Sequence, residues 1–250
     1  MRIALISDTH GNAVALESVM TDMQSQKVDR IIFLGDALTI GCQPKETLEI
    51  IKGLHCICIM GNHDSAVLKP KRAAQLQIAS NLHASLDWCA QQMTSADLNF
   101  LHSFLPSYEL QLTDNLSALF FHGSPLSNTD LIISTTPPEA IDAFFEGQTA
   151  SIWAGGHSHI QMLRRHGDKL ILNPGSVGNA FYHAFTPGTV PRLLPWAEYA
   201  ILNVEKGAAR SRNNQFTVEM RRVSFDTQEV LRLAAASDFP SKDWWLEQYT

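Results

Sequence analysis

The first sixty residues alternate apolar runs with helical patterns, and this alternation constrains the fold more than any other feature of the sequence. Strand-like runs occupy residues 3–7, 30–34 and 56–60. Between them, residues 12–26 and 44–54 carry apolar side chains at roughly helical spacing. A strand–helix–strand order of this kind predicts a parallel sheet with right-handed crossovers, and therefore an α/β fold.

The remainder of the chain is less regular. Helices are expected over 76–93 and 95–104, inside a helical insertion (65–105) that would form part of a pocket wall. Two later helices are expected at 136–145 and from Asp226, as the capping residue, to about residue 236. Further strand-like runs follow at 108–112, 117–121, 152–154, 162–165, 169–172, 199–204 and 216–224.

The chain is expected to form a single domain over residues 1–250. Its hydrophobic content of 45% is enough for a full core, and no stretch has the composition of a linker. Residues 197–250 would supply the last strands, a helix and a tail. The tail, which contains Trp244 and Trp245, is interpreted as an edge or a partner-facing segment, and this leaves a homo-oligomer open.

Composition also limits the partners and the compartment. The net charge of −6 argues against non-specific binding of nucleic acid or of a membrane surface. No apolar run approaches the ~20 residues of a membrane span, and the N-terminus does not have the pattern of a signal peptide. The four cysteines are too scattered for a disulfide framework, so a cytoplasmic location is expected.

Five of the strand-like runs end in side chains typical of metal ligands. Because ligands bind outside the carboxyl ends of parallel strands, these side chains are expected to meet at one edge of the sheet. Taken singly, each has an ordinary explanation, such as a helix cap or a buried histidine, but their recurrence at five strand ends favours one shared site. The five sets are Asp8 and His10; Asp36; Asn62, His63 and Asp64; His122; and His157 and His159.

The segment from Gly155 to His159 is the last of these strand ends. In extended backbone, residues i and i+2 point the same way, so His157 and His159 can face one target.

In this order the motifs DxH, GD, GNHD, HG and GGHxH resemble those of the calcineurin-like metallophosphoesterase superfamily, over residues 1 to about 178. Within it, the chain is similar to the small YfcE-like prokaryotic phosphodiesterases. The resemblance implies a four-layer α/β/β/α sandwich of two mixed sheets.

The resemblance also implies a centre of two metal ions. The first ion would be held by Asp8, His10, Asp36 and His159, and the second by Asp36, Asn62, His122 and His157. Two octahedral ions offer ~12 positions, of which these residues fill about eight, so the site stays open to water and substrate. Imidazole, carboxylate and amide donors suit manganese, iron, zinc, nickel or cobalt.

The chemistry implied is hydrolysis of a phosphate ester by a metal-bridging hydroxide, with His63 as the catalytic histidine. Asp64 either orients His63 or caps the helix that follows. Asn12 either contacts a phosphate oxygen of the substrate or caps a helix. His183 is a further candidate on the substrate side.

One loop departs from the pattern of the superfamily's protein phosphatases. Thr39 and Ile40 replace an aspartate that supports the catalytic histidine and an arginine that grips phosphate. Without that arginine a phosphodiester, as a small or nucleotide-like substrate, is favoured. The alternatives are a phosphomonoesterase, a nucleotide pyrophosphatase or a non-catalytic scaffold. Substrate choice is assigned to the insertion and to the loops at 124–135 and 179–196.

Overall fold

The computed structural model describes residues 1–184, 191–205 and 216–249. Residues 185–190 of the loop expected to take part in substrate choice therefore lie outside the described residues.

The first sheet grows from the predicted parallel unit at the N-terminus. Strands β1, β2 and β3 are parallel, whereas β9 runs antiparallel to β1, and β10 runs antiparallel to β9. The spatial order is β10-β9-β1-β2-β3. The strand bounds are β1 Arg2–Ile6, β2 Arg30–Phe33, β3 Ile57–Cys58, β9 Trp196–Val204 and β10 Phe216–Ser224.

The second sheet is also mixed, in the order β4-β5-β6-β8-β7. Its inner strands β5, β6 and β8 are parallel, and β4 and β7 pair antiparallel at the two edges. The strand bounds are β4 Tyr108–Thr113, β5 Leu116–Phe120, β6 Ile152–Ala154, β7 Gln161–His166 and β8 Lys169–Pro174.

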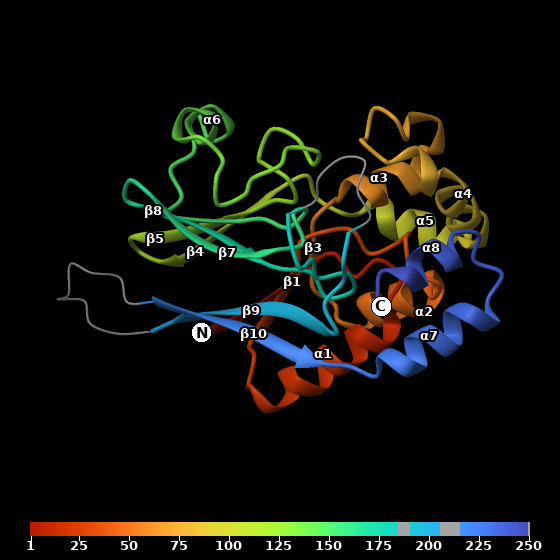
Figure 1. Cartoon of the computed structure of the whole chain (residues 1–250). Coiled ribbons are helices and arrows are strands. Elements are labelled where there is room, and N and C mark those ends of the chain that lie inside the picture. The colour runs from red at the N-terminus through yellow and green to blue at the C-terminus, as the bar shows by residue number, and fades with distance from the viewer. Residues whose placement is uncertain (185–190, 206–215, 250) are drawn as a thin grey trace.

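Helices cover the outer faces of both sheets (Figure 1). One 3-10 turn, Ser80–Leu82, leads directly into α4, and another, Pro70–Arg72, follows α3. The helix bounds are α1 Ala13–Ser25, α2 Pro44–Gly53, α3 Asn62–Leu68, α4 His83–Gln92, α5 Ser95–His102, α6 Pro138–Phe144, α7 Thr227–Ala236 and α8 Lys242–Glu247.

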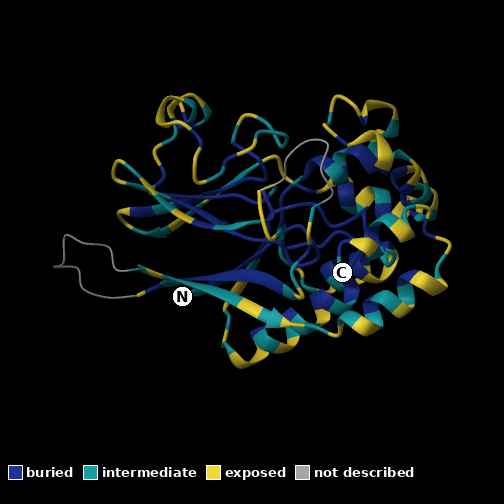
Figure 2. Ribbon diagram, in the orientation of Figure 1, coloured by how far each residue is buried: buried dark blue, intermediate teal, exposed yellow. Residues whose placement is uncertain are grey.

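Because side chains alternate in direction along a strand, each sheet has two apolar faces. On β1, Ile3 and Leu5 enter the core between the sheets, and Ala4 and Ile6 pack under the helices. On β6, Ile152 faces the same inner core, and Trp153 packs beneath α6. The buried strands in the middle of Figure 2 mark this arrangement. The expected four-layer α/β/β/α sandwich of two mixed sheets is confirmed.

Two expectations about helices need correction. The helix expected to begin near residue 76 begins at His83, because Gln77 takes a left-handed conformation (φ 57°) that ends the preceding turn. The Ile78 N–H then bonds back to the Ala73 carbonyl. The tail is not an edge: Trp245 lies in helix α8 and is 1% exposed, because its ring completes the core under the helices.

No helix in the described part of the chain is long and apolar enough to cross a membrane.

The inner core generates a stability prediction. Phe120 of β5 is fully buried between the sheets, so Phe120→Ala should lower the free energy of unfolding by about 3–5 kcal/mol. Leu163 of β7 is 52% exposed, and Leu163→Ala should change it by less than about 0.5 kcal/mol. Urea unfolding of both variants measures the difference; equal losses would contradict the packing described.

Candidate metal centre

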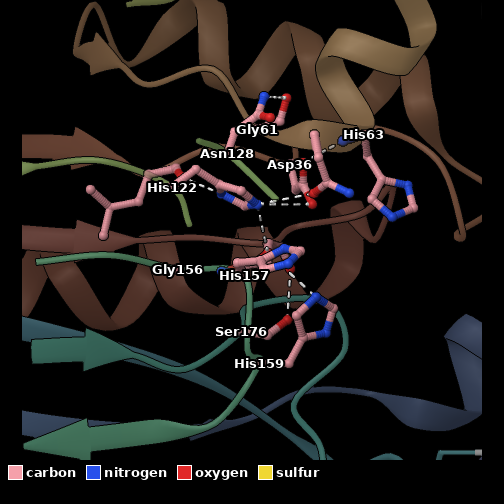
Figure 3. A network of polar contacts seen from close by, with 12 residues as sticks. Asp36, Gly61, His63, His122, Asn128, Gly156, His157, His159 and Ser176 are labelled. Carbon is pink, nitrogen blue, oxygen red and sulfur yellow. Dashed lines mark hydrogen bonds and ion pairs between the residues drawn. The ribbon is translucent and has the colours of Figure 1, made fainter. Parts of the chain in front are cut away.

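The predicted ligand residues converge at the carboxyl ends of strands from both sheets of the sandwich, rather than at the edge of one sheet. Asp8, Asp36 and Asn62 follow β1, β2 and β3 of the first sheet, whereas His122 and His157 follow β5 and β6 of the second. In Figure 3, His122 lies on the side of Asp36 opposite to His63, and His157 lies below them, toward His159. Face-to-face packing of two sheets thus brings together residues that are far apart in the sequence.

The backbone around the centre is strained. Several non-glycine residues take left-handed conformations, which cost about 1–3 kcal/mol each and persist only where surrounding structure holds them. Backbone hydrogen bonds supply that support: Asp8 N–H donates to the Gly35 carbonyl (2.9 Å). The ligand-type residues in this conformation are Asp8 (φ 55°), His10 (45°), Asp36 (60°), His157 (67°) and His159 (58°).

Three imidazoles are held in one tautomer. The Nδ1 atoms of His10, His122 and His159 each contact a backbone carbonyl, which only accepts, so each Nδ1 must carry the proton. The accepting carbonyls belong to Leu38 (3.2 Å), Leu34 (2.7 Å) and Asn179 (2.8 Å) respectively. The Nε2 lone pairs are thereby aimed into the centre, as in histidines that ligate metals.

Two of these Nε2 atoms meet where a positive charge, either a proton or a metal ion, would be stabilised. The Nε2 atoms of His10 and His159 lie 3.0 Å apart, where two lone pairs repel unless a positive charge lies between them. Beside them, Asp8 Oδ1 is buried without a hydrogen-bond partner, 3.3 Å from His159 Nε2. Asp36 Oδ2 lies 3.2 Å from His122 Nε2. The donor set therefore fits bound divalent transition metals.

The pKa shifts of His10 and His122 also indicate a site that favours positive charge. Burial lowers the pKa of His10 to about 3, so this ring stays neutral and free to ligate. Burial also acts to lower the pKa of His122, but the Asp36 carboxylate beside it outweighs burial and raises the pKa to about 10. In the chain alone, a proton on His122 thus supplies the positive charge that the carboxylates attract.

Asn62 is oriented with its oxygen toward the centre. Its Nδ2 donates to the Leu76 carbonyl (2.9 Å) in the helical insertion, which leaves Oδ1 facing His122 Nε2 at 3.3 Å. An amide oxygen is a metal ligand and an amide nitrogen is not. The insertion therefore contributes to the orientation of one predicted ligand.

When residues are grouped by ligand atoms that lie within 4.8 Å of one another, the two histidines of the HxH motif fall into different groups. His159 groups with Asp8 and His10, whereas His157 groups with Asp36 and His122. A third group joins His10, Asp36 and His63, so Asp36 belongs to two of the three. The division of these residues between two ions stays a prediction.

His63 lies beside the cluster and is half-buried. It is contacted by Thr39, the residue that replaces the supporting aspartate. The Nδ1 of His63 is 2.5 Å from the hydroxyl of Thr39, so a neutral side chain contacts the ring where the protein phosphatases use a carboxylate. Thr39 reaches this position through a left-handed backbone (φ 69°), unusual for a β-branched residue. Burial lowers the pKa of His63 below its ordinary value.

Asp64 is occupied by backbone amides. Oδ2 accepts from Asp36 N–H (2.7 Å) and Gly61 N–H (3.2 Å), and Oδ1 accepts from Ala37 N–H (2.9 Å). These bonds cap α3 and tie it to the loop that carries Asp36. Burial, reinforced by Asp36, raises the pKa of Asp64 to about 7. Of the two roles considered for Asp64, capping is the one with contacts in the structure; a catalytic role stays a prediction.

Asn12 likewise has structural partners at both ends of its amide. Oδ1 caps α1 by accepting from Ala15 N–H (3.1 Å), and Nδ2 donates to the Gly178 carbonyl (3.1 Å). Contact with a substrate phosphate stays a prediction for this residue.

Asn128 was missed by the sequence reasoning, because an asparagine in a polar loop has no distinctive pattern. Its Nδ2 donates to the Gly61 carbonyl (3.0 Å) and to Ser65 Oγ (2.9 Å), so it joins a loop of the second sheet to the start of α3 (Figure 3). The 124–135 loop therefore supports the strand end that carries Asn62.

Comparison with known proteins identifies a family. The calcineurin-like phosphoesterase superfamily domain matches residues 1–205. An uncharacterized protein of Methanocaldococcus jannaschii is 26% identical over 249 residues, 98% of this chain and 95% of the relative.

Two solved structures align with most of this chain, and the first of them shares its fold. A metallophosphoesterase from Sphaerobacter thermophilus has a TM-score of 0.72 and 24% identity, covering 99% of this chain and 98% of that chain. YfcE, a phosphoesterase from E. coli, has a TM-score of 0.46 and 19% identity, covering 80% of this chain and 87% of that chain.

The close approach at Gly61 is testable. A Cβ there would overlap the backbone nitrogen and carboxylate of Asp36, so Gly61→Ala should lower the free energy of unfolding by about 1–3 kcal/mol. Gly53, at the end of α2, has open space around it, and Gly53→Ala should leave stability unchanged or raise it by about 0.5–1 kcal/mol. Urea unfolding compares them, and a neutral Gly61→Ala would show that this contact is not tight.

Proposed function

The chain belongs to the calcineurin-like phosphoesterase superfamily, and from that premise we propose that it is a phosphodiesterase whose centre holds two transition-metal ions. The observation that carries this proposal is the convergence of three histidine Nε2 atoms on the buried carboxylates of Asp8 and Asp36. Charged groups are buried in this way only where opposite charge compensates them.

The residues divide between two ions as their spacing suggests. Asp8, His10 and His159 would hold one, Asn62, His122 and His157 the other, and Asp36 would contact both. Manganese, iron, zinc, nickel or cobalt suits these donors. When bound, such ions would lower the pKa of a coordinated water and offset the charge of a phosphate ester.

The chain's own groups supply orientation and proton transfer. His63 stands beside the cluster rather than in the middle of it, with its ring 4.9 Å from that of His10. Thr39 holds one nitrogen of the His63 ring, which leaves the other to donate a proton to the leaving alkoxide.

A diester is the favoured substrate because the loop after β2 offers no extra cation. Ile40, 9% exposed, occupies the place of the phosphate-gripping arginine. Among the described residues, no arginine hydrogen-bonds or ion-pairs with the cluster. A phosphodiester carries one negative charge where a monoester carries up to two, so it needs less compensation.

The substrate class is tested with metal-loaded protein on bis-p-nitrophenyl phosphate, p-nitrophenyl phosphate and a dinucleoside polyphosphate. The proposal expects faster turnover of the diester. Preference for the monoester would make the protein a phosphomonoesterase, and cleavage of a dinucleoside polyphosphate alone would make it a nucleotide pyrophosphatase. No turnover of any of them, with both metals confirmed by elemental analysis, would indicate a scaffold.

The role of His63 gives a second prediction. His63→Gln should lower kcat by about 10²–10⁴-fold while metal content stays unchanged, because the ring acts beside the ions. His102, an exposed residue at the end of α5, is the matched control, and His102→Gln should leave kcat unchanged. Elemental analysis accompanies the kinetics, and loss of metal from His63→Gln would contradict the assigned role.

Variants of Thr39 test whether its hydroxyl orients His63. Thr39→Val removes the hydroxyl at nearly constant shape and should lower kcat less than His63→Gln does, whereas Thr39→Ser should restore it. Equal kcat for valine and serine would show that the hydroxyl does not orient His63.

A further inference from the structure

The C-terminal helix α8 contacts the loop after β8 through a buried hydrogen bond. Trp245 is 1% exposed, and its Nε1 donates to Asn179 Oδ1 at 3.0 Å. Because an indole nitrogen can only donate, this contact also determines which way the Asn179 amide points. Both residues lie far from each other in the sequence, and Trp245 lies beyond residue 205, where the family domain match ends.

Asn179 passes this restraint to a predicted ligand. Its backbone carbonyl accepts from His159 Nδ1 (2.8 Å), the bond that sets the tautomer of that ring. Its N–H donates to Ser176 Oγ (2.8 Å), and Ser176 Oγ in turn donates to the Asp8 carbonyl (2.7 Å). One residue of the loop after β8 therefore joins the C-terminal helix to two predicted ligands of the same ion.

A second link from the tail reaches the other side of the His159 ring. Phe181 stacks on His159, with ring centroids 4.4 Å apart and an interplanar angle of 27°. Phe181 pairs with Leu193, whose N–H donates to the carbonyl of Gln248 (3.0 Å). His159 is thus held along its edge and over its face by segments that contact α8.

We propose that Trp245 is a positioning residue of the metal centre, which acts through Asn179 to fix His159 for the ion shared with Asp8 and His10. This inference rests on the proposed two-metal function and adds the tail to it. The competing explanation is packing alone, since Trp245 also contacts the rings of Phe239 and Tyr249. The two differ in what removal of the indole N–H does to metal binding.

The experiment titrates Mn²⁺ into chelator-stripped full-length protein by calorimetry. Trp245→Phe keeps an aromatic ring and removes the donor, so one of two binding steps should weaken by about 3–10-fold while the other stays unchanged. Trp244, the half-buried neighbour on α8, is the matched control, because its known hydrogen bond uses its backbone carbonyl. Trp244→Phe should leave both steps as in the wild type.

Asn179→Ala removes the acceptor and leaves Trp245 in place, so it serves if Trp245→Phe does not fold. It should weaken the same step, and the double variant should weaken it no further, because both changes break one link. Unchanged Mn²⁺ affinity in either folded single variant would overturn the positioning role. Wild-type protein that binds no Mn²⁺ would instead overturn the two-metal proposal and this inference with it.

Discussion

The rest of the structure depends on two buried carboxylates, those of Asp8 and Asp36. Burial alone would raise the pKa of both, yet neighbouring histidines outweigh it, lowering the pKa of Asp8 to about 2 and that of Asp36 well below its ordinary value. Charge buried in this way must be compensated nearby, and backbone carbonyls orient His10 and His159 so that their Nε2 atoms face the carboxylates. A cation is the species that satisfies both sets of groups.

The fold offsets the backbone strain of this arrangement. Left-handed backbone at ligand-type residues is unfavourable one residue at a time, and it is stabilised here by strand ends that are held in two sheets. The core between those sheets, which includes Leu5 and Phe120, fixes their separation and therefore the distances across the centre. Stability of the apolar core and geometry of the polar centre are consequently linked.

Segments outside the sheets complete the site by contacting predicted site residues or the strand end that carries them. Leu76 of the helical insertion orients Asn62, Asn128 ties a loop of the second sheet to the same strand end, and Thr39 holds His63. In the superfamily's protein phosphatases an aspartate and an arginine occupy the Thr39 and Ile40 positions. Replacing them with uncharged residues leaves the orientation of His63 to a hydroxyl and removes one source of attraction for a dianionic phosphate.

The sequence by itself determined the parallel α/β unit, the two mixed sheets implied by family resemblance, and the set of ligand-type residues at five strand ends. These follow from local periodicity and motif order, which a single chain displays directly. Only the tertiary structure decided that the ligands come from the strand ends of two sheets and that Asn12 and Asp64 form hydrogen bonds with the backbone. It also decided that Trp245 of the C-terminal tail is buried and hydrogen-bonds to Asn179. Contacts such as Thr39 with His63, or Trp245 with Asn179, depend on the packing of segments distant in sequence, and no local pattern encodes them.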